Sequence, residues 1–253
     1  MPQDAESFKK RMRDLVGATY WESPPAVVEF QEKHISPAGA LVFALEHCAF
    51  TDAFPRWFGN IVGNCDEIEV RAYMIGNMFM EEVKDPTMEL GHNESMWAFA
   101  EALGVTQKAI REHEPLISTT MALCYFDNVA RTKPWLEAFA GLGCLELLTN
   151  AAIAERYGHV PINAKEPWAK LNLGERALSH WAAAEIADHG KGDNGPGHGE
   201  QALDLVAKFA RTGEQQDRCA RALREVCRVA WHHFDQIGIK AIEATRKAAK
   251  KPA

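Results

Sequence analysis

Apolar residues recur three or four positions apart along most of the chain, the spacing that places them on one face of a helix. Near the start, Phe8, Met12, Leu15 and Val16 follow this spacing over residues 4–17. Prolines and glycines interrupt the pattern at intervals, whereas the strict alternation of apolar and polar residues typical of strands is nearly absent. The pattern therefore predicts an all-α protein.

The interruptions predict about seven to nine helices in a single-domain bundle over residues 1–253, with its core at about 38–245. We expect a bend near Pro55, because proline removes a backbone hydrogen bond inside a helix. A tail at about 246–253 is expected to fray. The longer predicted helices cover residues 4–17, 38–65, 67–83, 88–104, 116–131, 134–158, 173–189, 199–213 and 214–250.

Composition and charge narrow the function classes. The chain of 253 residues carries a net charge of −7, which argues against a nucleic-acid partner, since that requires a basic face. Its apolar runs fall short of the roughly 18 residues of a membrane span, and its charged N-terminal segment does not resemble a secretory signal. Six cysteines without a CxxC pair are typical of reduced, mostly buried thiols. We expect a soluble cytoplasmic protein that binds neither nucleic acid nor membrane.

The segment His189–His198 separates two alanine-rich helices and contains four glycines and one proline. Glycine and proline are the poorest helix formers, so the segment alone favours a polar turn. It also contains His189, Asp193 and His198, which can bind a metal ion. The preceding helix offers a competing set, Glu185 and His189, at i and i+4. Both sets stay open as metal ligands.

Two earlier helices carry further candidate ligands. Glu46 lies in an apolar run, where part of it should face the interior. Glu89 and His92 have the i, i+3 spacing of the Glu-x-x-His pairs that bind metal ions in helical bundles. Glu82, at the end of the preceding predicted helix, can reach the same centre, and the sequence does not decide between Glu82 and Glu89.

Glu146 is the only charged residue between Glu137 and Glu155 and is surrounded by small and apolar residues. A carboxylate in such surroundings is expected to be paired or functional, since an unpaired buried charge is costly. Carboxylate and imidazole donors on four helices suit iron or manganese better than zinc. The sequence lacks the Walker A, GxSxG and HExxH motifs, so it gives no support to a phosphate-cradling or acyl-enzyme mechanism.

The order of these motifs resembles the haem-oxygenase-like di-iron oxidases and oxygenases over roughly residues 40–240. The segment MELGHNESMW is especially similar to the alkene-forming fatty-acid decarboxylases of this superfamily, and DNGPGHGEQALDL resembles its late Asp/His helix. Related members cleave or N-oxygenate amino acids. The resemblance implies a haem-oxygenase-like helical fold.

The same resemblance implies two ferrous ions, O₂ as co-substrate and a small amino acid or fatty acid as substrate. An external electron donor and a homodimer are compatible with it. Arg131 and Lys133 are candidates for holding a substrate carboxylate. The implied metal ligands are Glu46, Glu82 or Glu89, His92, Glu146, Asp193 and His198, with His189 as a supporting or alternative ligand. The spacing from Asp193 to His198 is longer than is usual in the superfamily, which keeps Glu185 and His189 open.

Two other hypotheses stand beside this one. The same helical fold includes metal-free thiaminase-like and quinone-synthase-like enzymes, for which Cys124 and Cys144 offer a nucleophile. The chain can also be a non-catalytic binding protein whose acidic core residues are ion-paired.

Overall fold

The computed structural model describes residues 1–189 and 197–250, with the backbone alone for 187–189. The described residues form thirteen α-helices and no strand, as the all-α prediction requires. The number exceeds the expected seven to nine because α2, α6, α9 and α10 have only four to six residues each. The helices are α1 (Ala5–Val16), α2 (Ala26–Glu29), α3 (Pro37–Asn64), α4 (Ile68–Glu82), α5 (His92–Ala102), α6 (Gln107–Arg111), α7 (Ile117–Thr132), α8 (Trp135–Leu142), α9 (Ala151–Arg156), α10 (Lys165–Ala169), α11 (Glu175–His189), α12 (His198–Phe209) and α13 (Gly213–Ala249).

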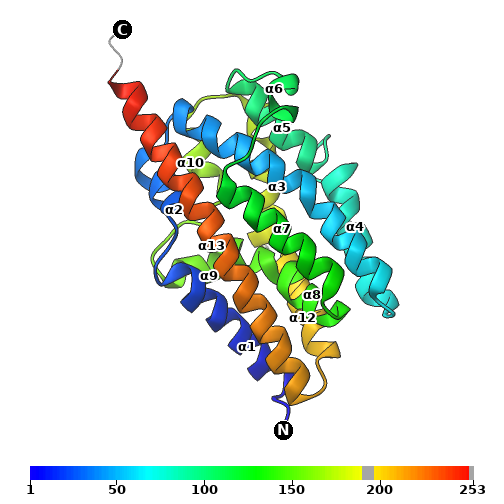
Figure 1. Cartoon of the computed structure of the whole chain (residues 1–253). Coiled ribbons are helices and arrows are strands. Elements are labelled where there is room, and N and C mark those ends of the chain that lie inside the picture. The colour runs from blue at the N-terminus through cyan, green and yellow to red at the C-terminus, as the bar shows by residue number, and fades with distance from the viewer. Residues whose placement is uncertain (190–196, 251–253) are drawn as a thin grey trace.

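The longest helix, α13, runs the length of the bundle and packs against α2, α3, α7 and α8 (Figure 1). It begins with a capping box, in which the Thr212 side chain and the Gln215 side chain each bond to the other residue's backbone. It continues to Ala249, so helical structure extends into the tail that was expected to fray. The helix α3 is likewise continuous through Pro55.

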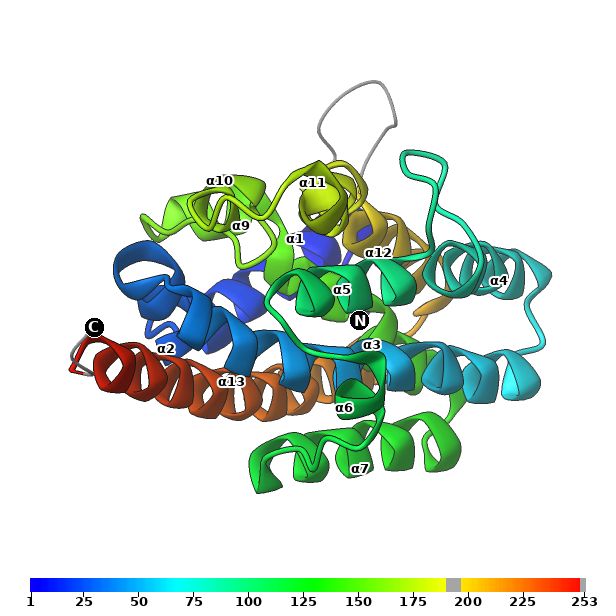
Figure 2. The same ribbon diagram turned by 90° about the horizontal axis from the view of Figure 1, so that it is seen from above.

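A second group of helices lies beside this framework. Figure 2 shows α5 between α3 and α11, with α4 next to it, and all three of these helices contact α5. On the remaining side, a short 3₁₀ helix, η3 (Gly143–Thr149), packs against α8 and α12. The elements that carry candidate ligands therefore meet in one part of the bundle.

Two of the differences between the predicted helices and the structure concern candidate ligands. The predicted helix 134–158 is interrupted at Gly143, where η3 begins, and a new helix starts after Asn150, whose side chain caps it by accepting from Ile153 N–H. The predicted helix 88–104 begins only at His92. Residue 89 consequently lies in a loop, because Gly91 has the extended backbone of a residue that precedes a helix.

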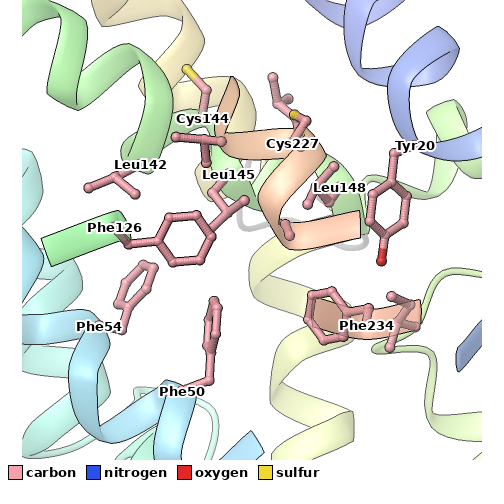
Figure 3. Packing of buried hydrophobic residues seen from close by; sticks show 14 of the residues in the cluster. Tyr20, Phe50, Phe54, Phe126, Leu142, Cys144, Leu145, Leu148, Cys227 and Phe234 are labelled. Carbon is pink, nitrogen blue, oxygen red and sulfur yellow. The ribbon is translucent and has the colours of Figure 1, made fainter. Parts of the chain in front are cut away.

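Aromatic side chains dominate the core. Trp57, Trp168 and Trp181 are fully buried, and Figure 3 shows Phe50 and Phe54 of α3 close to Phe126 of α7. Two π-helical turns, η1 (Gly17–Trp21) and η2 (Phe30–His34), follow α1 and α2 in the N-terminal part of the chain. Within the described ranges, no helix is long and apolar enough to cross a membrane.

Candidate metal centre

A pocket with a volume of about 120 Å³ lies where α3, α4, α5, η3 and α11 meet. Its wall is largely aromatic and aliphatic. The charged and imidazole side chains that line it are Glu81, Glu146, His47, His92 and His180. Buried carboxylates beside imidazoles in a mostly apolar cavity are the features expected of a functional site.

One group of donors comes from the junction of α4 and α5. The Nδ1 atom of His92 lies 3.4 Å from a carboxylate oxygen of Glu81. The other ring nitrogen, Nε2, lies 2.9 Å from an oxygen of Asp85, which is only 2 % exposed. Asp85 in turn accepts hydrogen bonds from the backbone N–H and the hydroxyl of Thr87. The carboxylate of Asp85 thus holds His92 through Nε2 and leaves Nδ1 on the side of Glu81.

Gly91 allows this junction to form. A Cβ atom at Gly91 would lie 2.7 Å from the backbone oxygen of Glu81, closer than real Cβ contacts permit. The absence of a side chain lets the start of α5 approach the end of α4. His92, the next residue, therefore reaches Glu81.

The second group comes from η3 and α12. The Nδ1 atom of His198 lies 3.8 Å from Glu146 Oε2, too far for a hydrogen bond. The side-chain amide of Asn77 lies 3.4 Å from Glu146 Oε1 and 3.4 Å from His198 Nδ1. Glu146 Oε2 is buried and has no hydrogen-bond partner.

Gly199 has the same role here that Gly91 has at the other junction. A Cβ atom at Gly199 would lie 2.7 Å from the backbone nitrogen of Leu147. Helix α12 can therefore contact the backbone of η3, which places His198 beside Glu146. Arg13 also holds α12, through two hydrogen bonds of 2.8 and 2.6 Å to Glu200.

Burial and mutual repulsion control the charges in the pocket. Burial, together with the charge of Glu81, raises the pKa of Glu146 to about 8. Burial opposes the charged form of His92, but the carboxylates of Glu81 and Asp85 prevail and hold its pKa well above the ordinary value. Burial lowers the pKa of His47 to about 4. Glu146 therefore retains its proton near neutral pH, and a cation beside it would favour the carboxylate form.

The structure brings together three of the ligands named from the sequence, His92, Glu146 and His198, and places Glu46 elsewhere. Glu46 is 2 % exposed, but its carboxylate faces the start of α7. It accepts hydrogen bonds from the Leu116 backbone at 3.1 Å and from the Thr119 hydroxyl at 2.5 Å, and His113 Nε2 lies 2.8 Å away. The pocket-lining face of α3 instead presents His47, one residue later.

Glu82 and Glu89 are both exposed and do not line the pocket. The helical Glu-x-x-His pair is not formed, because Glu89 precedes the first residue of α5. Of the competing late sets, Glu185 accepts a hydrogen bond from the Lys165 backbone at the start of α10. The side chain of His189 and all of Asp193 lie outside the described residues.

Sequence reasoning missed Glu81, Asn77 and Asp85. A signal for the first two was present, because the buried residues of α4 are Val70, Met74, Asn77 and Glu81. Their spacing of i, i+4, i+7 and i+11 marks one helix face, and Glu82 does not lie on it. No such signal exists for Asp85, which lies in an irregular loop.

Comparison with known proteins decides the family. A family model described as iron-containing redox enzyme matches residues 41–231. The chain belongs to this family. Two curated relatives of this chain, from Chlamydia trachomatis and Chlamydia muridarum, are both called 4-aminobenzoate synthase. They are 27 % identical over 109 residues and 25 % identical over 130 residues, or 41 % and 49 % of this chain. The matches span 46 % and 53 % of those proteins, about half of their length.

Solved structures show the fold of this family member. A domain with a heme oxygenase-like fold from Shewanella denitrificans has a TM-score of 0.64 at 13 % identity and covers 98 % of this chain and 96 % of its own. A TenA homologue from P. horikoshii has a TM-score of 0.68 at 12 % identity and covers 94 % of this chain and 100 % of its own. The haem-oxygenase-like fold predicted from the sequence is therefore confirmed.

The described residues of this family member fit iron in their chemistry. They contain no group of three or more His, Cys, Asp or Glu side chains already close enough to hold a metal ion together. They do bring two carboxylate and imidazole pairs to one part of the bundle, Glu81 with His92 and Glu146 with His198. The unpartnered Oε2 of Glu146 is a buried acceptor that a cation would satisfy. Carboxylate oxygens and imidazole nitrogens on facing helices are the donors of di-iron sites.

Proposed function

We propose that this protein is an O₂-dependent non-haem di-iron oxidase or oxygenase that acts on a small organic molecule. The observation that carries the proposal is the unpartnered, buried oxygen of Glu146 in a pocket shared with Glu81 and His92. Membership of an iron-containing redox enzyme family supports it. Glu81, His92, Glu146 and His198 would hold the metal, with His189 and Asp193 as further candidates from the sequence.

Iron bound there would supply the capacity to reduce O₂ and to oxidise a substrate, either at a carbon with cleavage of a C–C bond or at an amine nitrogen. An external electron donor is part of the same proposal. The chain's own residues prepare the site. Asp85 fixes the orientation of His92, and the apolar wall formed by Phe43, Phe50 and Phe234 keeps water from the reacting groups.

A metal-free mechanism with a thiol nucleophile finds less support in the structure. The described lining of the pocket contains no cysteine. Cys144 is buried elsewhere in the core, and burial holds the pKa of its thiol well above the ordinary value, which disfavours the reactive thiolate. Cys124 is exposed on α7.

An anaerobic titration with ferrous iron, followed by measurement of bound iron and of O₂ consumption, tests the proposal. Two neighbouring carboxylates provide a matched pair of variants. Glu81→Gln should abolish tight iron binding, whereas Glu82→Gln, the same change on the exposed face of α4, should leave it unchanged. Less than one iron per wild-type chain, or equal iron binding in the two variants, would contradict the proposal.

A further inference from the structure

The pocket contains two polar groups that are not needed to hold a metal and have no partner in the protein. The indole Nε1 of Trp181 and the ring Nδ1 of His47 are both buried without a hydrogen-bond partner. Both residues line the pocket, and Trp181 is 1 % exposed. A buried indole N–H normally has an acceptor, and leaving a donor unpaired costs about 1–3 kcal/mol. These atoms indicate a ligand with a polar group.

The rings beside these groups form a set of nearly parallel planes. The His47 ring lies 5.7 Å from Phe50 at an interplanar angle of 8° and 5.0 Å from Phe43 at 29°. Trp181 lies 6.3 Å from His47 at 21°. Aromatic rings pack favourably at centroid distances of about 4.5–7 Å. The wall around His47 is therefore suited to a flat ring.

The size and charge of the pocket favour a small ligand without a net negative charge. Its volume of about 120 Å³ is similar to the roughly 150 Å³ of an engineered cavity that accepts benzene. The described lining contains no Lys or Arg, whereas it does contain Glu81 and Glu146. Arg131, expected from the sequence to hold a substrate carboxylate, is exposed and paired with Asp127. A free carboxylate would therefore meet no Lys or Arg in the described lining, and the charge of His92 there is already balanced by Glu81 and Asp85.

We propose that the pocket binds a neutral, single-ring aromatic molecule whose hydroxyl-like substituent accepts a hydrogen bond from Trp181 Nε1. The ring lies against the planes around His47, and His47 Nδ1 offers a second hydrogen bond to the substituent. The inference names the substrate class of the proposed oxidation and rests on that proposal for the reaction, although ligand binding can be measured without it. It replaces the amino acid or fatty acid expected from the sequence.

The binding of four probes to the full-length protein tests the substrate class. Phenol has the ring and the hydroxyl, toluene has the ring alone, cyclohexanol has the hydroxyl on a ring that is not flat, and octanoate represents a fatty acid. Calorimetry or protein NMR should show that phenol binds about tenfold or more tightly than cyclohexanol and octanoate. Equal or tighter binding of either of these would overturn the proposal.

Two tryptophan variants test the hydrogen bond. Trp181→Phe should weaken phenol binding about tenfold, the effect of one lost hydrogen bond, and should change toluene binding by less than about twofold. Trp97→Phe is the matched control, because Trp97 Nε1 is also buried without a partner but Trp97 does not line the pocket. It should leave both affinities unchanged. An equal loss of phenol and toluene in Trp181→Phe would indicate a purely structural role and overturn the assignment.

The same titrations with metal-free and anaerobic ferrous protein separate this inference from the proposed function. Selective binding of phenol by a protein that takes up no iron would support the pocket assignment while the di-iron proposal fails. Normal iron uptake without selectivity for phenol would overturn the pocket assignment alone.

Discussion

Two buried carboxylates of this protein, Glu46 and Glu146, look alike in the sequence and differ in their surroundings. Both oxygens of Glu46 accept hydrogen bonds, from the Leu116 backbone and the Thr119 hydroxyl, at the start of α7. Glu146 accepts only a long hydrogen bond from Asn77 on Oε1, and its Oε2 has no hydrogen-bond partner, since His198 Nδ1 is 3.8 Å away. Burial raises the pKa of Glu146 to about 8.

We interpret Glu46 as a carboxylate that stabilises the fold and Glu146 as one that is available to a ligand. A buried acceptor without a partner costs about 1–3 kcal/mol, so the protein retains Glu146 at some expense of stability. Glu46, in contrast, satisfies an N–H group that the first turn of a helix leaves unpaired. A negative charge there is also favoured by the helix dipole.

The largest expected effect is on metal affinity in Glu146→Gln. We expect the affinity for ferrous iron to fall about a thousandfold or more, beyond the roughly 10- to 100-fold typical for residues that only support a ligand. The stability of the metal-free protein at neutral pH should stay about the same, since burial already keeps Glu146 largely uncharged there and the amide is uncharged too. Iron titration and urea unfolding measure the two quantities. A loss of stability with normal iron binding would indicate that Glu146, like Glu46, only stabilises the fold.

Glu46→Ala should have the opposite profile. Removing its carboxylate leaves the Leu116 N–H and the Thr119 hydroxyl without their acceptor, so we expect a loss of about 2–3 kcal/mol in the free energy of unfolding. The iron affinity of the folded protein should be unchanged. Glu46→Gln, which keeps one acceptor oxygen, should lose less. Weaker iron binding in a folded Glu46 variant would show that this residue belongs to the centre after all.

Asp85→Asn tests whether a carboxylate can serve the site without touching the metal. The amide can no longer hold His92 as the carboxylate does, so iron affinity should fall about 10- to 100-fold. Nitrogen NMR of the His92 ring in metal-free protein should show a changed tautomer or protonation state. An unchanged His92 spectrum would remove Asp85 from this role.

The smallest expected effect is on the pH dependence of the free energy of unfolding. His233 is 1 % exposed, both its ring nitrogens lack a partner, and burial lowers its pKa to about 3. Below pH 6.5, the ordinary pKa of histidine, the unfolded chain binds a proton that the folded chain does not, so His233 makes stability fall as the pH decreases towards 3.

His233 lowers the free energy of unfolding by at most about 1.4 kcal/mol for each pH unit. Urea unfolding between pH 7 and pH 5 should show a smaller decrease in stability for His233→Phe than for the wild type. Identical pH profiles would show that His233 is solvated or paired in solution.

The sequence by itself determined the helical class and most helix positions, because these depend on local periodicity, proline and glycine. It also named His92, Glu146 and His198 as candidates, each of which stands out from apolar or glycine-rich neighbours, and the structure brings these three to one part of the bundle. The haem-oxygenase-like fold was implied by the resemblance to a known family that the order of these motifs carries. The spacing of apolar residues also shows which face of a helix is buried, and on α4 this spacing selects Glu81 rather than Glu82.

Only the tertiary structure decided which buried carboxylate has a partner. The acceptor role of Glu46 depends on α7, about 70 residues further along the chain, and no local pattern reveals that the two elements meet. The loop that carries Asp85 and the close approaches at Gly91 and Gly199 are equally non-local. A sequence shows that a residue is buried through its own neighbours, but whether its polar atoms are satisfied depends on segments that only folding brings to it.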